Sequence, residues 1–76
     1  MIEIDIHGMH VEEARQRIDQ LLKTANKSTL IIRIIHGYSN GDRLKNMVRS
    51  RYRKHPRVQR IELSMNPGIT DLILKL

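Results

Sequence analysis

The 76-residue chain contains no cysteine, no phenylalanine and no tryptophan, and only two tyrosines. Without cysteine it can form neither a disulfide nor a thiolate metal site, which is compatible with a reducing compartment. We therefore expect a cytoplasmic location. The scarcity of aromatic side chains also removes the stacking platform that is typical of single-strand nucleic-acid binders.

Long apolar runs are absent as well. The longest run, LIIRIIHG at residues 30–37, is interrupted by Arg33 and falls far short of the roughly 20 apolar residues that a membrane span needs. Glu3 and Asp5 lie where a signal peptide would be apolar. We expect no contact with a membrane, and a single domain over residues 1–76 that either stands alone or belongs to a longer protein.

Acidic residues are few, with 8 Asp+Glu against 14 Lys+Arg, and the net charge is +6. The basic excess lies mainly in residues 43–60, where no acid occurs between Asp42 and Glu62. A solvated helix face is the ordinary alternative for one charge run. The density here instead favours a polyanion, most often nucleic acid, bound through its phosphates. The residues predicted to bind phosphate are Arg33, Arg43, Lys45, Arg49, Arg53, Lys54, Arg57 and Arg60.

The hydropathy pattern predicts six elements in the order β-α-β-α-β-β. Two helices can cover only one face of four strands, so we expect an α/β two-layer sandwich with a mixed sheet. Strands joined through a helix are expected to pair in parallel. The predicted strands are residues 2–7, 29–36, 58–63 and 71–76, and the predicted helices are residues 11–25 and a second one that ends near His55 and Pro56.

The helix-free face of this sheet is expected to be ionic. Side chains alternate along a strand, so the isoleucines of residues 2–6 direct their polar neighbours to the opposite face. The side chains expected on the helix-free face are Glu3, Asp5, His7, Arg33, Arg60 and Glu62, and those expected to face the helices include Leu30 and Leu63.

Two short stretches end alike, IDIHG at residues 4–8 and RIIHG at residues 33–37. If the first two strands are parallel neighbours, both His-Gly turns lie at one carboxyl edge, where open α/β sheets bind ligands. Helix amino termini and glycines at this edge suit a phosphate. We expect Asp5, His7 and His36 to act there as catalytic residues, the imidazoles moving protons and Asp5 orienting one of them or acting as the base.

A metal site is the weaker alternative for the same residues. Asp5, His7 and His36 could together hold one cation, but no dense cluster of further carboxylates accompanies them. We therefore expect no metal and no cofactor. For any single histidine, a structural or solvent-exposed role is more common than a catalytic one.

Three stretches resemble the landmarks of the small MutS-related (Smr) domain family: IDIHGMHVEEA at residues 4–14, IIHGYSNGDRLKNMV at 34–48 and NPGITDLIL at 66–74. The resemblance implies a sandwich like the carboxyl-terminal domain of a bacterial translation initiation factor. It also implies binding and endonucleolytic cleavage of DNA or RNA, including messenger RNA on stalled ribosomes. The family's Asp-x-His catalytic element falls on Asp5 and His7, and its glycine loop on His36, Gly37 and Gly41.

This chain departs from the family pattern at two positions. The loop commonly reads His-Gly-x-Gly-x-Gly, and Ser39 stands at its middle glycine. Gly37, Ser39 and Gly41 are expected to contact nucleic acid, although the serine presents a side chain where other members present bare backbone. His10 stands where a helix-capping threonine is typical, so a cap hydroxyl is lost.

Three functions stay open on these grounds. The leading hypothesis is a nuclease domain that binds structured RNA or DNA through residues 43–60 and cleaves at the edge that holds Asp5, His7 and His36. The rivals are a non-catalytic module that binds DNA, RNA or a ribosome, and a protein-interaction domain that uses Ile31 and Ile35 on the open sheet face. The sequence does not distinguish DNA from RNA, and it does not indicate an oligomeric state.

Overall fold

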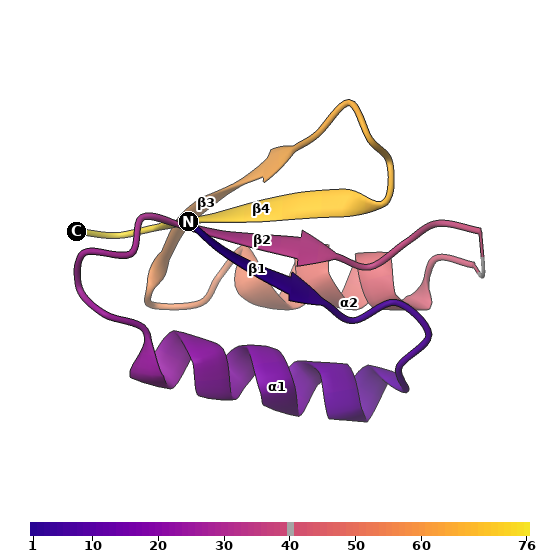
Figure 1. The fold of residues 1–76 in the computed structure, drawn as a ribbon, viewed down its shortest axis with the longest axis horizontal. Helices are drawn as coiled ribbons and strands as arrows, with labels where there is room; N and C mark the ends of the chain where they lie inside the picture. The colour runs from indigo at the N-terminus through magenta and orange to yellow at the C-terminus, as the bar shows by residue number, and fades with distance from the viewer. Residues whose placement is uncertain (40) are drawn as a thin grey trace.

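Two helices cover one face of a four-stranded sheet in the computed structural model, which describes residues 1–39 and 41–76 (Figure 1). This confirms the predicted element order and the two-layer sandwich. No helix in the described part of the chain has the length and apolar character needed to cross a membrane. The elements are β1 (Ile2–Asp5), α1 (Val11–Thr24), β2 (Ile31–Ile35), α2 (Arg43–Tyr52), β3 (Val58–Leu63) and β4 (Ile69–Leu74).

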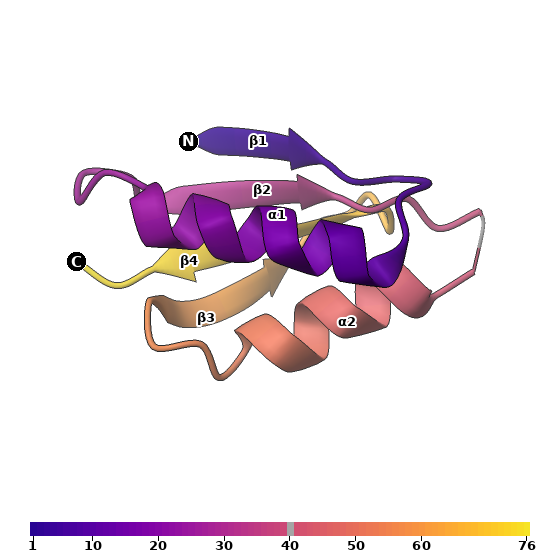
Figure 2. The ribbon, with the colours of Figure 1, turned by 90° about the horizontal axis from the view of Figure 1, so that it is seen from below.

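The strands lie in the order β1-β2-β4-β3 (Figure 2). β1 and β2 are parallel neighbours, as predicted, but β4 pairs antiparallel with both β2 and β3. The expectation of parallel pairing is therefore correct across α1 and wrong across α2. The physical reason is that the last strand enters the sheet between β2 and β3, so α2 does not connect neighbouring strands.

The strand bounds differ from the prediction mainly where turns begin. β1 ends at Asp5 and β2 spans only Ile31–Ile35, so both His-Gly pairs lie just beyond their strands. β4 begins at Ile69, two residues earlier than expected. A tight turn makes this early start possible, because the Ile69 amide donates to the Asn66 carbonyl oxygen at 3.2 Å.

The core lies between the sheet and the helices. α1 contributes Ala14, Ile18 and Leu22, which recur every four residues and therefore share one face of the helix. Leu30 and Leu63, expected to pack under the helices, are exposed instead. Leu30 precedes β2, and Leu63 lies at the end of the edge strand β3, so neither is covered by a helix. The buried residues of the strands are Ile32, Ile34, Val58, Thr70, Leu72 and Leu74, and Ile6, directly after β1, is buried as well.

A polar cluster joins the two helices. Asp19 of α1 accepts hydrogen bonds from the Tyr52 hydroxyl at 2.6 Å and from Arg51 Nη2 at 2.9 Å. Burial and the neighbouring Asp19 carboxylate raise the pKa of Tyr52, so its hydroxyl stays a donor. The cluster fixes α2 against α1 and thereby sets where the first turn of α2 lies.

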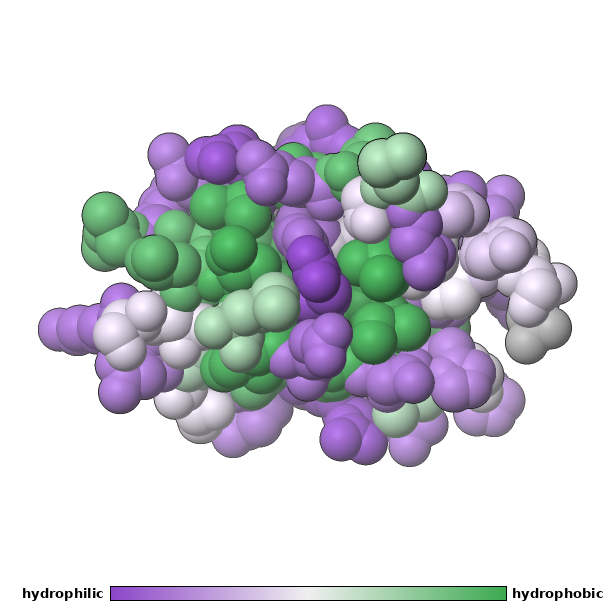
Figure 3. All heavy atoms as spheres, turned by 45° about the horizontal axis from the view of Figure 1, so that its top comes forward, coloured by the Kyte–Doolittle hydropathy of each residue, from purple (hydrophilic) through white to green (hydrophobic). Residues whose placement is uncertain are grey.

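The helix-free face carries ionic side chains, as the alternation predicted. Arg33 and Asp71 face each other across β2 and β4 and form a bidentate ion pair, with Nε–Oδ1 at 2.9 Å and Nη2–Oδ2 at 3.0 Å. A bulge between Val58 and Arg60 lets Val58 pack inward while Arg60 stays outward. Figure 3 shows this side of the molecule, where a polar band separates two apolar areas.

Candidate active site

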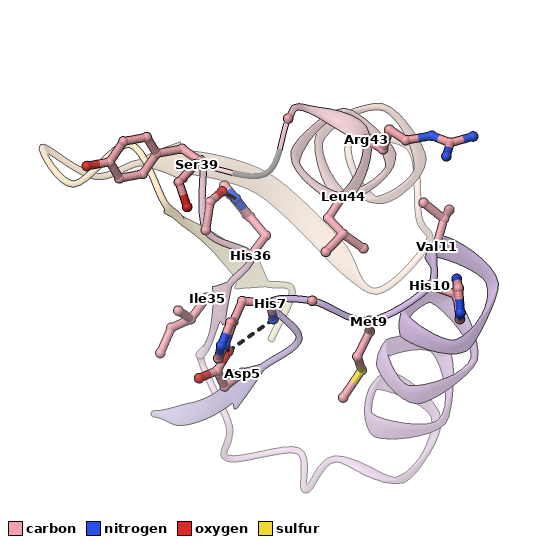
Figure 4. Close-up of a pocket in the computed structure, with 14 residues that line it drawn as sticks. Asp5, His7, Met9, His10, Val11, Ile35, His36, Ser39, Arg43 and Leu44 are labelled. Atoms are coloured by element: carbon pink, nitrogen blue, oxygen red, sulfur yellow. Dashed lines mark hydrogen bonds and ion pairs between the residues drawn. The ribbon is translucent and has the colours of Figure 1, made fainter.

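The carboxyl ends of β1 and β2 border an open cavity of about 580 Å³ (Figure 4). Both His-Gly turns line it, which confirms the prediction that they share one edge of the sheet. The loop before α2 and the first turn of α2 form the remaining wall. The cavity brings together the predicted site residues Asp5, His7, His36, Gly37, Ser39, Gly41 and Arg43.

Asp5 and His7 form a hydrogen-bonded pair at this edge. Asp5 Oδ1 lies 2.6 Å from His7 Nδ1 and 3.0 Å from the His7 backbone nitrogen. These bonds from His7 lower the pKa of Asp5, so its carboxylate is the acceptor and Nδ1 is the donor. Nε2 is then the ring nitrogen that carries a free lone pair. The His7 side chain is 67% exposed, so Nε2 is available to a ligand.

The chain after His7 turns sharply into α1. Gly8 adopts a left-handed conformation with φ of 77°, which glycine reaches without steric cost. The Met9 amide then donates to the Ile6 carbonyl oxygen at 3.0 Å, which closes the turn. His10 is the N-cap of α1 and makes no side-chain cap hydrogen bond, as its replacement of threonine led us to expect. The tight turn holds His7 at the end of β1.

His36 occupies a different environment and is only 4% exposed. Its Nδ1 lies 2.7 Å from the Gly37 carbonyl oxygen, and its Nε2 lies 2.9 Å from Thr70 Oγ1. A carbonyl only accepts, so Nδ1 donates and Nε2 accepts the Thr70 hydroxyl proton. Thr70 Oγ1 in turn accepts from Arg49 Nε at 3.2 Å. One directed chain of hydrogen bonds thus runs from Arg49 through Thr70 and His36 to Gly37.

This environment keeps His36 neutral. Burial lowers the pKa of His36, and the charges of Arg49 and Lys45 lower it further, although the bond to the Gly37 carbonyl opposes them. Both ring nitrogens of His36 are thus engaged in hydrogen bonds within the protein, whereas the sequence analysis expected this imidazole to move protons beside His7. A signal was present in the strand alternation, because Ile34 faces the core and His36, two residues later, must face the same side.

The glycine loop is held by the turn before β4. The Gly68 carbonyl oxygen accepts from the amides of His36 at 2.9 Å and Gly37 at 3.0 Å. Gly68 is buried, and a Cβ there would lie 3.2 Å from the Gly37 Cα, so a larger residue would push the two turns apart. Asn66 Oδ1 accepts the Gly68 amide at 2.8 Å and fixes the turn. Two distant landmarks of the sequence therefore form one structural unit.

The predicted phosphate-binding residues in α2 and directly after it fall into two groups: those without an ion pair to another described residue, and those bonded to a neighbouring side chain. Arg43 lines the cavity, and Figure 4 shows its guanidinium pointing away from Asp5 and His7. Arg53 and Lys54 are exposed at the end of α2 and form no ion pair with another described residue. Lys45 instead pairs with Asp42 at 3.1 Å, and Arg49 is bonded to Thr70.

The other predicted phosphate-binding residues have structural partners. Arg57 Nη1 donates to the Leu22 and Ala25 carbonyl oxygens and so caps the end of α1. Arg33 and Arg60 lie on the far side of the sheet from α2, where Arg33 pairs with Asp71 and Arg60 pairs with Glu62 at 3.1 Å. The fold therefore distributes the predicted phosphate-binding residues over both layers of the sandwich.

Several cavity residues were not anticipated from the sequence. Tyr38 is exposed and lines the cavity beside the glycine loop, so an aromatic face is present despite the poor aromatic content. Its position directly after His-Gly was the available signal. The apolar lining had no such signal, because its residues also fit the helix patterns. The apolar lining residues are Met9, Val11, Ile35 and Leu44, and His10 also lines the cavity, as does Gly8 of the predicted His-Gly turn.

A metal-binding arrangement is not found among residues 1–39 and 41–76, where no three His, Asp or Glu side chains gather to hold an ion. Asp5 and His7 are bonded to each other, and both nitrogens of His36 have protein partners. Of the atoms that could bind a metal, Asp5 Oδ1, His7 Nδ1 and both ring nitrogens of His36 are therefore hydrogen-bonded within the protein.

Comparisons with known proteins agree with this geometry. The family model of the Smr domain matches residues 4–67. The protein named endonuclease MutS2 of Thermomicrobium roseum is 38% identical over 63 residues, which cover 82% of this chain and 8% of that protein. The crystal structure of the Smr domain of Thermus thermophilus MutS2 superposes with a TM-score of 0.89 at 26% identity, covering 100% of both chains. The chain thus spans about a twelfth of the curated relative's length.

Proposed function

Because this chain belongs to the Smr domain family, we propose that it binds nucleic acid and cleaves phosphodiester bonds at the cavity beside Asp5 and His7. The observation that carries the proposal is the 2.6 Å hydrogen bond from His7 Nδ1 to Asp5, which leaves Nε2 exposed at a ligand-binding edge. Residues 1–76 act as one domain in this proposal, and its work on nucleic acid is cytoplasmic.

The Asp5–His7 pair has the chemistry of a general base. His7 Nε2 accepts the proton of an attacking hydroxyl, either of water or of a ribose, as that oxygen bonds to phosphorus. The bond from phosphorus to the leaving oxygen then breaks, that oxygen takes up a proton from water, and the His7 imidazolium afterwards returns its own proton to solvent. Asp5 holds the ring in the correct tautomer and stabilises the imidazolium that forms, as the carboxylate does in hydrolytic triads. Arg43 lines the same cavity, and a rotation of its guanidinium toward the phosphate would let it stabilise the charge that develops there.

The glycine loop supplies the binding surface in this proposal. Gly37 has no side chain, so a ligand can approach its backbone closely, and its amide is bonded to the Gly68 carbonyl oxygen. The exposed ring of Tyr38 offers a face on which one base can stack. Either DNA or RNA satisfies these contacts, and an RNA substrate includes RNA on a ribosome. Arg53 and Lys54 extend the contact along the backbone of the nucleic acid.

A non-catalytic binding module is the second candidate. The observation that favours it is Ser39, whose side chain lines the cavity at the position of the middle family glycine. In that case phosphate is bound but not positioned for attack by a hydroxyl near His7.

A cleavage assay on supercoiled plasmid and on structured RNA, with and without chelator, tests the proposal. We expect wild type to cleave at least one substrate, and Asp5→Asn and His7→Ala to bind it equally but to cleave it about a hundredfold more slowly. Glu13→Gln, which removes an exposed carboxylate of α1, is the matched control and should cleave normally. Full cleavage by Asp5→Asn would refute the proposed pair, and binding without cleavage by wild type would establish the second candidate.

A further inference from the structure

β1 is an edge strand, and an open groove of about 480 Å³ lies between it and α1. Figure 2 shows β1 at the margin of the sheet, beyond the part that α1 covers. The apolar residues of the groove are Ile2, Ile4 and Leu21, and its polar residues are Glu3, Gln16, Arg17, Gln20 and Thr24. None of them lines the candidate active site, so this groove is a separate feature of the molecule.

The backbone of β1 presents unpaired hydrogen-bonding groups along this groove. The Ile6 amide donates to the Ile35 carbonyl oxygen of the β2 chain at 2.9 Å. Along a strand, the backbone amide and carbonyl groups of successive residues point to opposite edges. The backbone groups of Ile2, Ile4 and Ile6 therefore point toward β2. The amide and carbonyl groups of Glu3 therefore point outward, where the described chain places no strand beside them.

The opposite edge of the sheet carries a bulge that discourages pairing with a further strand, whereas β1 carries none. β3 carries a bulge between Val58 and Arg60, and an ion pair between Arg60 and Glu62 lies on its outward face. Bulges and charged pairs of this kind discourage pairing with a further strand. β1 pairs with β2 in an unbroken register, and its sequence IEID contains neither proline nor a basic residue.

We propose that the β1 edge binds an extended peptide segment of another protein, which adds a fifth strand beside β1. Apolar side chains of the peptide lie over Ile2, Ile4 and Leu21, and basic side chains lie opposite Glu3 on the helix-free face. Charge complementarity selects this occupant. A second copy of β1 would instead set Glu3 against the acidic side chains of an identical strand, which is unfavourable.

The test is an NMR titration of the ¹⁵N-labelled chain with a blocked heptapeptide in which lysine and valine alternate. We expect the signals of residues 2–4 and of Leu21 to shift, and the exchange of the Glu3 amide proton with solvent to slow at least tenfold. The control peptide alternates glutamate and valine and should bind at least tenfold more weakly, since its charges oppose Glu3.

Two substitutions of one exposed residue separate backbone pairing from charge. Glu3→Gln removes only the charge and should weaken binding about threefold. Glu3→Pro also removes the outward N–H while the bonds from β1 to β2 remain, so it should weaken binding at least tenfold beyond Glu3→Gln. If Glu3→Pro disturbs the fold, the wild-type chain with an N-methylated lysine–valine peptide gives the same readout.

Three outcomes would overturn the proposal: equal affinity for both peptides, signal changes confined to the cavity beside Asp5 and His7, or unchanged binding by Glu3→Pro. Displacement of the peptide from residues 2–4 by a short single-stranded RNA would also overturn the proposal and would assign the groove to nucleic acid. The result does not depend on the cleavage assay, because the two sites share no residue.

Discussion

His7 and His36 belong to the same His-Gly motif, which follows each of two neighbouring parallel strands, yet the fold gives them different environments. The His7 side chain is 67% exposed, and its Nδ1 donates a hydrogen bond to Asp5. His36 is buried, and both of its ring nitrogens are hydrogen-bonded. The register explains the difference, since Asp5 lies opposite Ile35 and the two motifs are therefore offset by one residue. A shift of one residue turns a side chain to the other face of a sheet.

The comparison shows that a motif locates a site without assigning the role of each member. The strands that lie beside β1 and β2 determine the environment of each histidine. β1 is an edge strand and leaves His7 open to a ligand, while β4 lies beside β2 and brings Thr70 against His36. We therefore regard His7 as the catalytic residue of the proposed site and His36 as a positioning residue of the glycine loop.

The largest expected effect comes from exchanging each histidine for alanine. His7→Ala should reduce cleavage about a hundredfold while leaving the free energy of unfolding nearly unchanged. His36→Ala should lower that free energy by about 2–3 kcal/mol, because it opens a cavity and leaves the Thr70 hydroxyl and the Gly37 carbonyl unpaired. Urea denaturation beside the cleavage assay measures both quantities.

Thr70→Val provides the control for the loss of volume at His36. It keeps the shape of the side chain but removes the hydroxyl between Arg49 and His36, so destabilisation of about 1–3 kcal/mol would come from hydrogen bonding alone. The contrast between the two turns would be wrong if His7→Ala proved the more destabilising of the two alanine variants.

A smaller effect is expected in the pH dependence of stability. The pKa of His36 is lower in the folded chain than its ordinary value of about 6.5, so the unfolded chain binds the proton first as pH falls. The free energy of unfolding should therefore decrease below about pH 6.5, by at most about 1.4 kcal/mol per pH unit for one proton. The slope should disappear in His36→Ala and persist in His7→Ala, as measured by urea denaturation between pH 7 and pH 5.

The hydrogen bond from His7 lowers the pKa of Asp5, and this shift affects the free energy of unfolding in a more acidic pH range than the shift of His36 does. The contribution of Asp5 is complete above its ordinary value of about 3.9 and is lost as pH falls through its lower folded value. The two residues are thus distinguished by the pH at which stability changes.

The smallest effects extend the same contrast to two arginines of one basic segment. Arg53→Ala should weaken nucleic-acid binding about threefold for every sequence and reduce the salt dependence by about one phosphate contact. Arg57→Ala should leave binding nearly unchanged but lower the free energy of unfolding by about 1 kcal/mol, since it uncaps α1. Salt titrations of binding, paired with thermal unfolding, measure both. A loss of binding in Arg57→Ala equal to that in Arg53→Ala would reject the distinction.

The sequence by itself determined the six elements, the single helical layer and the edge where ligand chemistry gathers. These follow from local periodicity and from the matching His-Gly ends of two strands, because both depend on residues close together in the chain. The outward position of Asp5, His7 and Arg33 followed from the same two-residue alternation. The burial of His36 was also within reach of that rule.

The tertiary structure alone decided which neighbours these residues have. The insertion of β4 between β2 and β3 brings Thr70 and Gly68 against the glycine loop, and it sets Asp71 against Arg33. Such contacts join residues more than thirty positions apart, and no local pattern specifies them. The sequence shows which residues are basic. Which acidic or carbonyl group each of them contacts depends on which strands and helices pack together.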